Sequence, residues 1–243
     1  YDNSPCVGTG ENGANMGALG VGCSSGPYIG PIWHVSTTGS DSNEGSESSP
    51  FATVQAAIGA SSDGDTVLVQ LGTYTGHIEI DKNHLTLTSQ FLFNSNDSLI
   101  EQTILRNDDS VYDNDRVITF SDGLEGISII GITIQDGNVV NGLNGGGIYF
   151  KNNDNVIIDH CVFTSNQAQP SGSGGSSDGF GGALYIETSN CTITNTVFNN
   201  NNAKNGGALA LLNQNDHTIF IDNCVFDNNT TITDIGSDLY VFQ

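Results

Sequence analysis

Apolar and polar positions in the second half of the chain alternate over short segments that repeat one another. Four such segments read ISIIGITIQDGN from Ile127, VIIDHCVFTSNQA from Val156, CTITNTVFNNNNA from Cys191 and IFIDNCVFDNNTT from Ile219. Alternation of this kind, with β-branched and aromatic side chains at the apolar positions, is typical of half-buried β-strands. The region is therefore expected to consist of short strands separated by polar turns.

Superposing the four segments places similar residues in common columns. The columns are Ile129, Ile158, Ile193 and Ile221; Ile134, Phe163, Phe198 and Phe226; Gly137, Asn166, Asn201 and Asn229; and Gly131, His160, Asn195 and Asn223. A second element recurs between them, as GGGIYF from Gly145, GGALYI from Gly181 and GGALAL from Gly206. A repeat of roughly 25 residues cannot bury its own apolar face, so copies must stack, with paired strands about 4.8 Å apart. The sequence thus predicts an all-β parallel β-helix, a solenoid in which Ile stacks on Ile, Phe on Phe and Asn on Asn. In the Asn column we expect left-handed backbone conformations and side-chain amides bonded to the next Asn.

The first half of the chain is less regular but reads as earlier coils of the same solenoid. DTVLVQLGTYTG from Asp65 and HIEIDKNHLTLTSQF from His77 predict strands and turns. Before them, SPFATVQAAIGAS has apolar residues at helical spacing after Pro50, which predicts a short N-terminal capping helix over the open end of the first coil. At the other end, LYVF at 239–242 predicts one more strand with no cap after it. Residues 33–243 are assigned to the β-helix and residues 1–32 to a glycine-rich N-terminal segment.

Charge and cysteine content narrow the classes of partner. Five Lys and Arg against 27 Asp and Glu give a net charge of −22, which disfavours nucleic acid and anionic membranes as partners. No apolar stretch reaches the about 18 residues that a membrane span needs, so membrane insertion is not expected. Cys6 and Cys23 bracket a short loop, for which a disulfide in an oxidising compartment and two free thiols are both open. The other cysteines lie in strand segments and are expected to be small buried apolar residues; they are Cys161, Cys191 and Cys224.

Two kinds of modification or ligand site follow from local motifs. Asp41, Asn43 and Glu47 place oxygen ligands in one loop, which makes them weak calcium candidates, with a plain acidic loop as the alternative. Sequons for N-glycosylation begin at Asn96, Asn190, Asn228 and Asn229, although chance accounts for sequons in an Asn-rich chain. The Ser/Gly-rich insertion between Asn166 and Gly182 is interpreted as a flexible spacer rather than a ligand-binding loop.

The segment WHVSTTGSDSNEGSESSPFATVQAAIGASSDGDTVLVQLGTYTGHIEI, from Trp33, and the repeated GGA…F…N coils resemble a known group of proteins. They look like secreted right-handed parallel β-helix proteins of the pectate-lyase-like superfamily, and are similar to bacterial extracellular and polymorphic outer-membrane-type repeats. The resemblance covers 33–243 and implies a right-handed solenoid in an extracellular or cell-surface protein. It leaves the activity open, since the superfamily holds lyases, hydrolases, epimerases, adhesins and structural shafts.

The resemblance implies two catalytic patterns, and the residues complete neither of them. Lyases of the superfamily use Lys or Arg near calcium; the basic residues here are Lys82, Arg106, Arg116, Lys151 and Lys204, which the repeat does not bring together. Hydrolases use three Asp on neighbouring coils; the candidates here are Asp136, Asp154, Asp159 and Asp178. Neither Asp136 nor Asp159 has an evident partner on the next coil, where Thr194 occupies the position matching Asp159. These aspartates are expected to be solvated turn residues, and no catalytic residue is assigned.

The glycine-rich stretch from Ser4 to Ala18 resembles the closing motif with which β-helix proteins of this type usually finish, but it lies at the opposite end. It is expected either to close a preceding tandem β-helix unit or to cover the open last coil of a neighbouring copy, head to tail. The sequence therefore favours a non-enzymatic extracellular structural or adhesive module, tandemly repeated or assembled into a filament. The alternatives are a β-helix that binds or degrades polysaccharide and a calcium-dependent surface adhesin.

Overall fold

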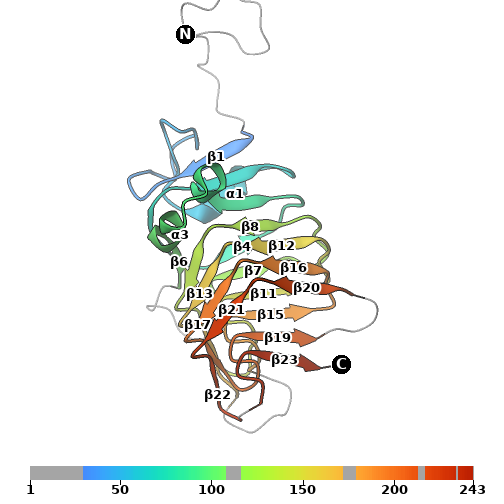
Figure 1. Ribbon diagram of the computed structural model, residues 1–243. Coiled ribbons are helices and arrows are strands. Elements are labelled where there is room, and N and C mark those ends of the chain that lie inside the picture. Colours follow the sequence, from blue (N-terminus) through green and yellow to red (C-terminus); the bar gives the residue numbers. More distant parts are fainter. Residues whose placement is uncertain (1–29, 108–115, 172–178, 213–216, 234, 243) are drawn as a thin grey trace, which may run out of the picture.

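The computed structural model describes residues 30–107, 116–171, 179–212, 217–233 and 235–242. The chain winds through four parallel sheets in turn, and each coil stacks on the one before, as Figure 1 shows. Sheet 1 contains β1 (Ile32–Val35), β2 (Thr66–Val69), β5 (Thr86–Ser89), β8 (Ser128–Ile130), β12 (Val156–Asp159), β16 (Cys191–Thr194) and β20 (Ile219–Asp222). Sheet 2 contains β3 (Gly72–Thr75), β6 (Thr103–Arg106), β9 (Thr133–Gln135), β13 (Val162–Thr164), β17 (Val197–Asn199) and β21 (Val225–Asp227). The predicted parallel β-helix is confirmed.

Two further sheets contribute to the coils, and sheet 3 is present only from the coil of β8 onward. Sheet 3 is narrow and contains β10 (Asn138–Val139), β14 (Gln167–Ala168), β18 (Asn202–Ala203) and β22 (Thr230–Thr231). Sheet 4 contains β4 (Ile78–Ile80), β7 (Ile118–Phe120), β11 (Ile148–Lys151), β15 (Leu184–Glu187), β19 (Leu209–Leu212) and β23 (Leu239–Phe242). We call the coil made of β20 to β23 the last coil.

The strand register superposes the residues that the repeats align. Sheet 1 pairs Ile158 with Ile129 on one side and with Ile193 on the other, and Ile193 in turn pairs with Ile221. In sheet 2 the Phe163, Phe198 and Phe226 rings stack with centroids 4.9 and 5.0 Å apart. Stacked rings and branched side chains fill the interior along the axis, so the core is continuous from coil to coil.

The Asn column is an internal ladder of hydrogen bonds. Asn166 and Asn201 are fully buried, and Asn229 is 7% exposed. The Asn166 Nδ2 donates to Asn201 Oδ1 at 3.1 Å, and the Asn201 Nδ2 donates to Asn229 Oδ1 at 3.0 Å. The expectation that these residues adopt left-handed conformations is wrong: the residues with positive φ stand one position earlier, as Ser165, Asn200 and Asn228. The left-handed residue makes the turn, which leaves the ladder Asn free to point inward.

Helix α1 (Val54–Ala60) covers the coil end that lies farthest from β23, beside β1 (Figure 1). Its Val54, Ala57 and Ile58 side chains are buried against the core, which confirms the predicted capping helix. The helix begins later than Pro50 suggests, since Thr53 is its N-cap and accepts a hydrogen bond from Ala56 N–H.

Two short helices, α2 (Phe91–Asn94) and α3 (Ser98–Gln102), interrupt the coil between β5 and β6. The sequence reasoning missed them because each is barely one turn long and has only one buried apolar anchor, Phe91 and Ile100 respectively. Among the described residues, no helix has the length and apolar character that a membrane crossing requires.

Candidate assembly interface

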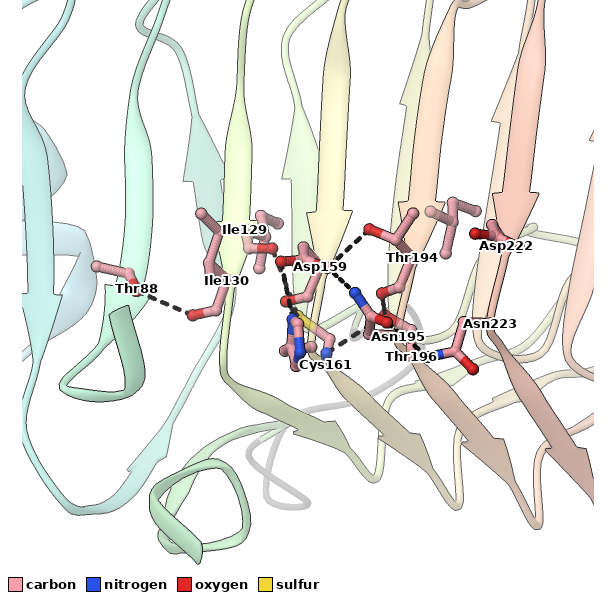
Figure 2. A network of polar contacts seen from close by, with 12 residues as sticks. Thr88, Ile129, Ile130, Asp159, Cys161, Thr194, Asn195, Thr196, Asp222 and Asn223 are labelled. Atoms are coloured by element: carbon pink, nitrogen blue, oxygen red, sulfur yellow. Dashed lines mark hydrogen bonds and ion pairs between the residues drawn. The ribbon is translucent and has the colours of Figure 1, made fainter. Parts of the chain in front are cut away.

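Asp159, at the end of β12, is the centre of the polar network in Figure 2. Its Oδ1 accepts hydrogen bonds from Thr194 Oγ1 at 2.7 Å and Asn195 Nδ2 at 2.9 Å, and its Oδ2 lies 2.8 Å from His160 Nδ1. The hydrogen-bonded network extends one coil further, because Asn223 Nδ2 donates to Asn195 Oδ1 at 2.6 Å. The expectation that Asp159 lacks a partner on the next coil is therefore wrong, because Thr194 and Asn195 are its partners.

The network suits a structural role better than acid–base chemistry. Burial raises the pKa of Asp159, but hydrogen bonds from Thr194, Asn195 and His160 outweigh burial, so the net pKa lies below its ordinary 3.8. A carboxylate held ionised in this way is a poor proton donor near neutral pH. His160 has a φ of +49°, and its ring lies 4.7 Å from the Phe91 ring.

We expect Asp159→Ala to lower the free energy of unfolding at pH 7 by about 1–2 kcal/mol, because it leaves the Thr194 and Asn195 donors without their acceptor. Since the folded-state pKa of Asp159 is depressed, its ionic contribution is present above pH 3.8 and is lost as the pH falls through the folded-state value. Thermal melts of both proteins at pH 7 and pH 3 test this. The gap in melting temperature should narrow at pH 3, and a gap that is equal at both pH values would contradict the ionised network.

The other charged residues that were candidates for catalysis also form hydrogen bonds or ion pairs, each at a different place in the structure. Asp136 pairs with Arg106 on the preceding coil, with Oδ2 and Nη2 3.3 Å apart. Asp154 Oδ1 accepts a hydrogen bond from Asn190 Nδ2 at 2.6 Å, while Asp178 lies outside the described residues. Basic side chains make local contacts: Lys82 with Asp81, Lys151 with Glu187, and Arg116 over the Tyr149 ring. Among the candidates that the structure describes, the side chains therefore form neither of the catalytic patterns that the resemblance implies.

The calcium candidates lie in the loop before α1. Asp41 Oδ1 accepts hydrogen bonds from the N–H groups of Ala52 and Thr53, both at 2.9 Å, so this carboxylate holds the start of the helix. Asn43 uses its side-chain amide to donate to Pro50 O at 2.8 Å, and Glu47 is exposed. Within the described ranges, no three His, Cys, Asp or Glu side chains gather closely enough to hold a metal ion. Calcium binding at these three residues stays a prediction.

The described cysteines and sequons differ in accessibility. Cys161 and Cys191 are buried and Cys224 is half-buried, all three with free thiols, and burial raises the pKa of the Cys161 thiol to about 12. Cys6 and Cys23 lie outside the described residues. Among the sequons, Asn96 and Asn228 are exposed and Asn190 is half-buried. The Asn229 side chain is committed to the internal ladder, which leaves its amide nitrogen no access to a glycan.

Aromatic side chains cover part of the outer face of sheet 4. The Tyr149 and Tyr185 rings stack 5.6 Å apart at an angle of 3°. Phe180, which belongs to the insertion interpreted as a spacer, is 3% exposed and packs against Tyr240 and Phe242. This end of the insertion is thus anchored on the sheet, which the Ser/Gly composition did not indicate.

The last coil leaves inward-pointing apolar side chains uncovered. Leu239 and Val241 pair with Leu209 and Leu211 of the previous coil, which are 0% and 6% exposed, yet they are themselves 41% and 54% exposed. The inward side chains of β20, β21 and the turn between them are also partly exposed; they are Ile219, Ile221, Cys224 and Phe226. An apolar area of this kind at the edge of parallel sheets is a candidate for an interaction surface. It is the candidate assembly interface.

Comparison with known proteins gives matches over most of the β-helix. A family model described as "Right handed beta helix region" matches residues 69–240, and one described as "Protein of unknown function (DUF1565)" matches residues 37–80. The "Probable autotransporter YfaL" of Escherichia coli (strain K12) is 34% identical over 113 residues. That match covers 42% of this chain but only 8% of the relative's length.

Two solved structures are similar in outline. Pectin methylesterase PemA from Erwinia chrysanthemi is 13% identical with a TM-score of 0.43, over 80% of this chain and 66% of that one. A rhamnogalacturonan lyase is 14% identical with a TM-score of 0.41, over 88% of this chain and 60% of that one.

Proposed function

The chain belongs to the family with a right-handed β-helix region, and from this premise we propose that it is a non-enzymatic structural or adhesive module of a secreted or cell-surface protein. In this proposal the module joins a neighbour, tandem or in another copy, through the last coil. The similarity to a probable autotransporter supports the secreted or surface location.

The observation that carries the proposal is the uncovered interior of the last coil. Leu239 and Val241 occupy positions that are buried in every preceding described coil of the repeat region, and their exposure costs free energy that a covering partner would recover. The polar clusters elsewhere support a structural role, because Asp159, Asp136 and Asp154 are all used to join neighbouring coils or residues.

Val241→Lys tests the interface, and the chain supplies a matched control. Val225 has the same exposed fraction, 54%, but points outward from β21, away from the open interior. In sedimentation velocity and electron microscopy of the purified protein we expect concentration-dependent end-to-end association, abolished by Val241→Lys and retained in Val225→Lys. A wild-type protein that stays monomeric at all concentrations would contradict association through the last coil.

The same preparation separates this proposal from the polysaccharide alternative. Incubation with acidic and neutral polysaccharides, with and without calcium, should give neither unsaturated products nor new reducing ends. Turnover of any of these polymers would contradict a non-enzymatic module.

A further inference from the structure

The glycine pair that opens each strand of sheet 4 has a steric function between stacked coils. A Cβ at Gly146 would lie 2.4 Å from Gln167 O on the next coil. A Cβ at Gly182 would lie 2.3 Å from Gly207 O, and one at Gly207 would lie 2.4 Å from Ser237 O. Real Cβ atoms do not approach a carbonyl oxygen this closely, so each of these positions must be glycine for the following coil to stack. The fourth residue of this column, on the last coil, is Ser237.

The next column shows a second change on the last coil. Gly147, Ala183 and Ala208 are buried, and a Cβ at Gly147 would face the Asn ladder, 3.3 Å from Asn166 Cγ. The last coil has Asp238 at this position. A carboxylate in a column of small buried residues would lose its water if another coil covered it, which costs far more than burying an alanine.

Asp238 also ends the Asn ladder. In the preceding coils the Asn Nδ2 donates to the Oδ1 of the next Asn, at 3.1 Å from Asn166 and 3.0 Å from Asn201. At the last rung, Asn229 Nδ2 donates instead to Asp238 Oδ1 at 3.1 Å. The carboxylate therefore occupies the place that the amide oxygen of a further Asn rung would take.

We propose that Ser237 and Asp238 are a built-in terminator of the coil stack, so that the last coil rejects a further β-helical coil in the same register. A partner that covers the last coil must leave room for the Ser237 side chain and must donate a hydrogen bond to Asp238. This deepens the proposed function, because it restricts the covering partner to something other than a continued stack of the same repeat.

Arg116 occupies the glycine column one coil before Gly146, and β11 still pairs with β7 there, so the rule is stated only for coils that have a strand of sheet 3. Sheet 3 begins with β10, so the turn at Arg116 is not packed between two strands of that sheet. There the side chain extends over the Tyr149 ring, with Cζ 4.6 Å from its centroid. Ser237, by contrast, follows β22, and its turn keeps the left-handed glycine of the earlier coils at Gly236, with φ of +61°.

Two extended chains test the terminator. In both, a copy of residues 207–236 is inserted after Gly236, so that one additional coil precedes Ser237. In the first chain the copy keeps Gly207 and Ala208 at its start. In the second, the copy carries Gly207→Ser and Ala208→Asp, so the two chains differ only at these two positions. The assay is thermal unfolding followed by circular dichroism at pH 7.

We expect the first extended chain to melt at or above the temperature of the parent protein, because stability in a solenoid grows with each compatible coil. The second should melt about 10 °C below the first, because its internal Asp and Ser oppose stacking. Single variants of the unextended chain give a second measurement. We expect Ala208→Asp to lower the melting temperature of the parent protein by a similar amount, and Asp238→Ala to lower it by about 2 °C or less.

Equal melting temperatures of the two extended chains would overturn the proposal, as would equal effects of Ala208→Asp and Asp238→Ala. All these measurements report stacking inside one chain. A negative result in these measurements would therefore contradict the terminator alone. The proposed function is tested separately, by the association of the wild-type protein.

Discussion

Gly182→Ser is expected to lower the free energy of unfolding by about 3 kcal/mol, with a fall in melting temperature of about 6–12 °C. The new Cβ would lie 2.3 Å from Gly207 O and 2.5 Å from Asn202 O. Both atoms belong to the backbone of the next coil, so no flexible side chain can move aside to relieve the contact. Gly182 is not among the residues with positive φ, so a side chain there causes no backbone strain. The whole loss of stability is therefore assigned to the contact between coils. Thermal and urea unfolding followed by circular dichroism measure it.

Gly59→Ala is the control for this prediction. Gly59 lies inside α1, and a Cβ built there would meet nothing within 4 Å. Alanine is the better helix former, so we expect Gly59→Ala to raise the free energy of unfolding by about 0.5–1 kcal/mol. If Gly182→Ser were as stable as the wild type, the packing of adjacent coils would be looser than the structure has it, and the argument from Ser237 would fail with it.

The repeated columns explain why the solenoid was predictable from the sequence. In a parallel stack, equivalent residues of successive coils share one environment, so Ile193 stacks on Ile221 and Phe198 on Phe226. The same reasoning located the Asn ladder but placed the left-handed residue one position too late. Asn is common at both positions, Asn200 and Asn201, and composition alone does not tell a turn residue from the inward one.

The polar network at Asp159 was missed for a related reason. In the aligned repeats the residue that matches Asp159 on the next coil is Thr194, and the repeat pattern does not indicate that its hydroxyl group donates a hydrogen bond to the carboxylate. The structure shows that Asn195, one position further along the next coil, also reaches this carboxylate because the left-handed turn directs its side chain back toward β12 (Figure 2). Diagonal contacts between coils depend on turn geometry, which the residue pattern does not specify.

The sequence indicates the terminator as a change in the repeated motif on the last coil. The motif GGGIYF, GGALYI, GGALAL is followed by GSDLYV from Gly236, in which the second glycine and the small third residue are both replaced. Its meaning needs the structure, because only the close approach of Gly207 to Ser237 O shows that the column excludes a Cβ. The exposed Val241 and the closed ladder at Asp238 then describe a face of the last coil that is apolar yet unsuited to a further coil in the same register.

Asn201→Ala is expected to be the most damaging single change in the Asn ladder, at about 3–4 kcal/mol. The Asn201 side chain accepts hydrogen bonds from both Asn166 N–H and Asn166 Nδ2, and it donates to Phe163 O and Asn229 Oδ1. Asn166 and Phe163 are fully buried, so the truncation leaves their hydrogen-bonding groups without a substitute from water, whereas Asn229 Oδ1 keeps the hydrogen bond from Asn201 N–H. Chemical denaturation at pH 7 measures the loss.

Two neighbouring variants show whether this loss belongs to the ladder. Asn200→Gly changes an exposed residue whose φ of +54° suits glycine, and we expect it to stay within about 0.5 kcal/mol of the wild type. Asn229→Ala removes a rung at the open end, where water reaches the site, so it should cost clearly less than Asn201→Ala. Equal losses for Asn201→Ala and Asn229→Ala would contradict an internal ladder that draws its strength from burial. The graded result would instead mean that each rung depends on the coil that covers it, which makes the way the last coil is closed decisive for the stability of the whole stack.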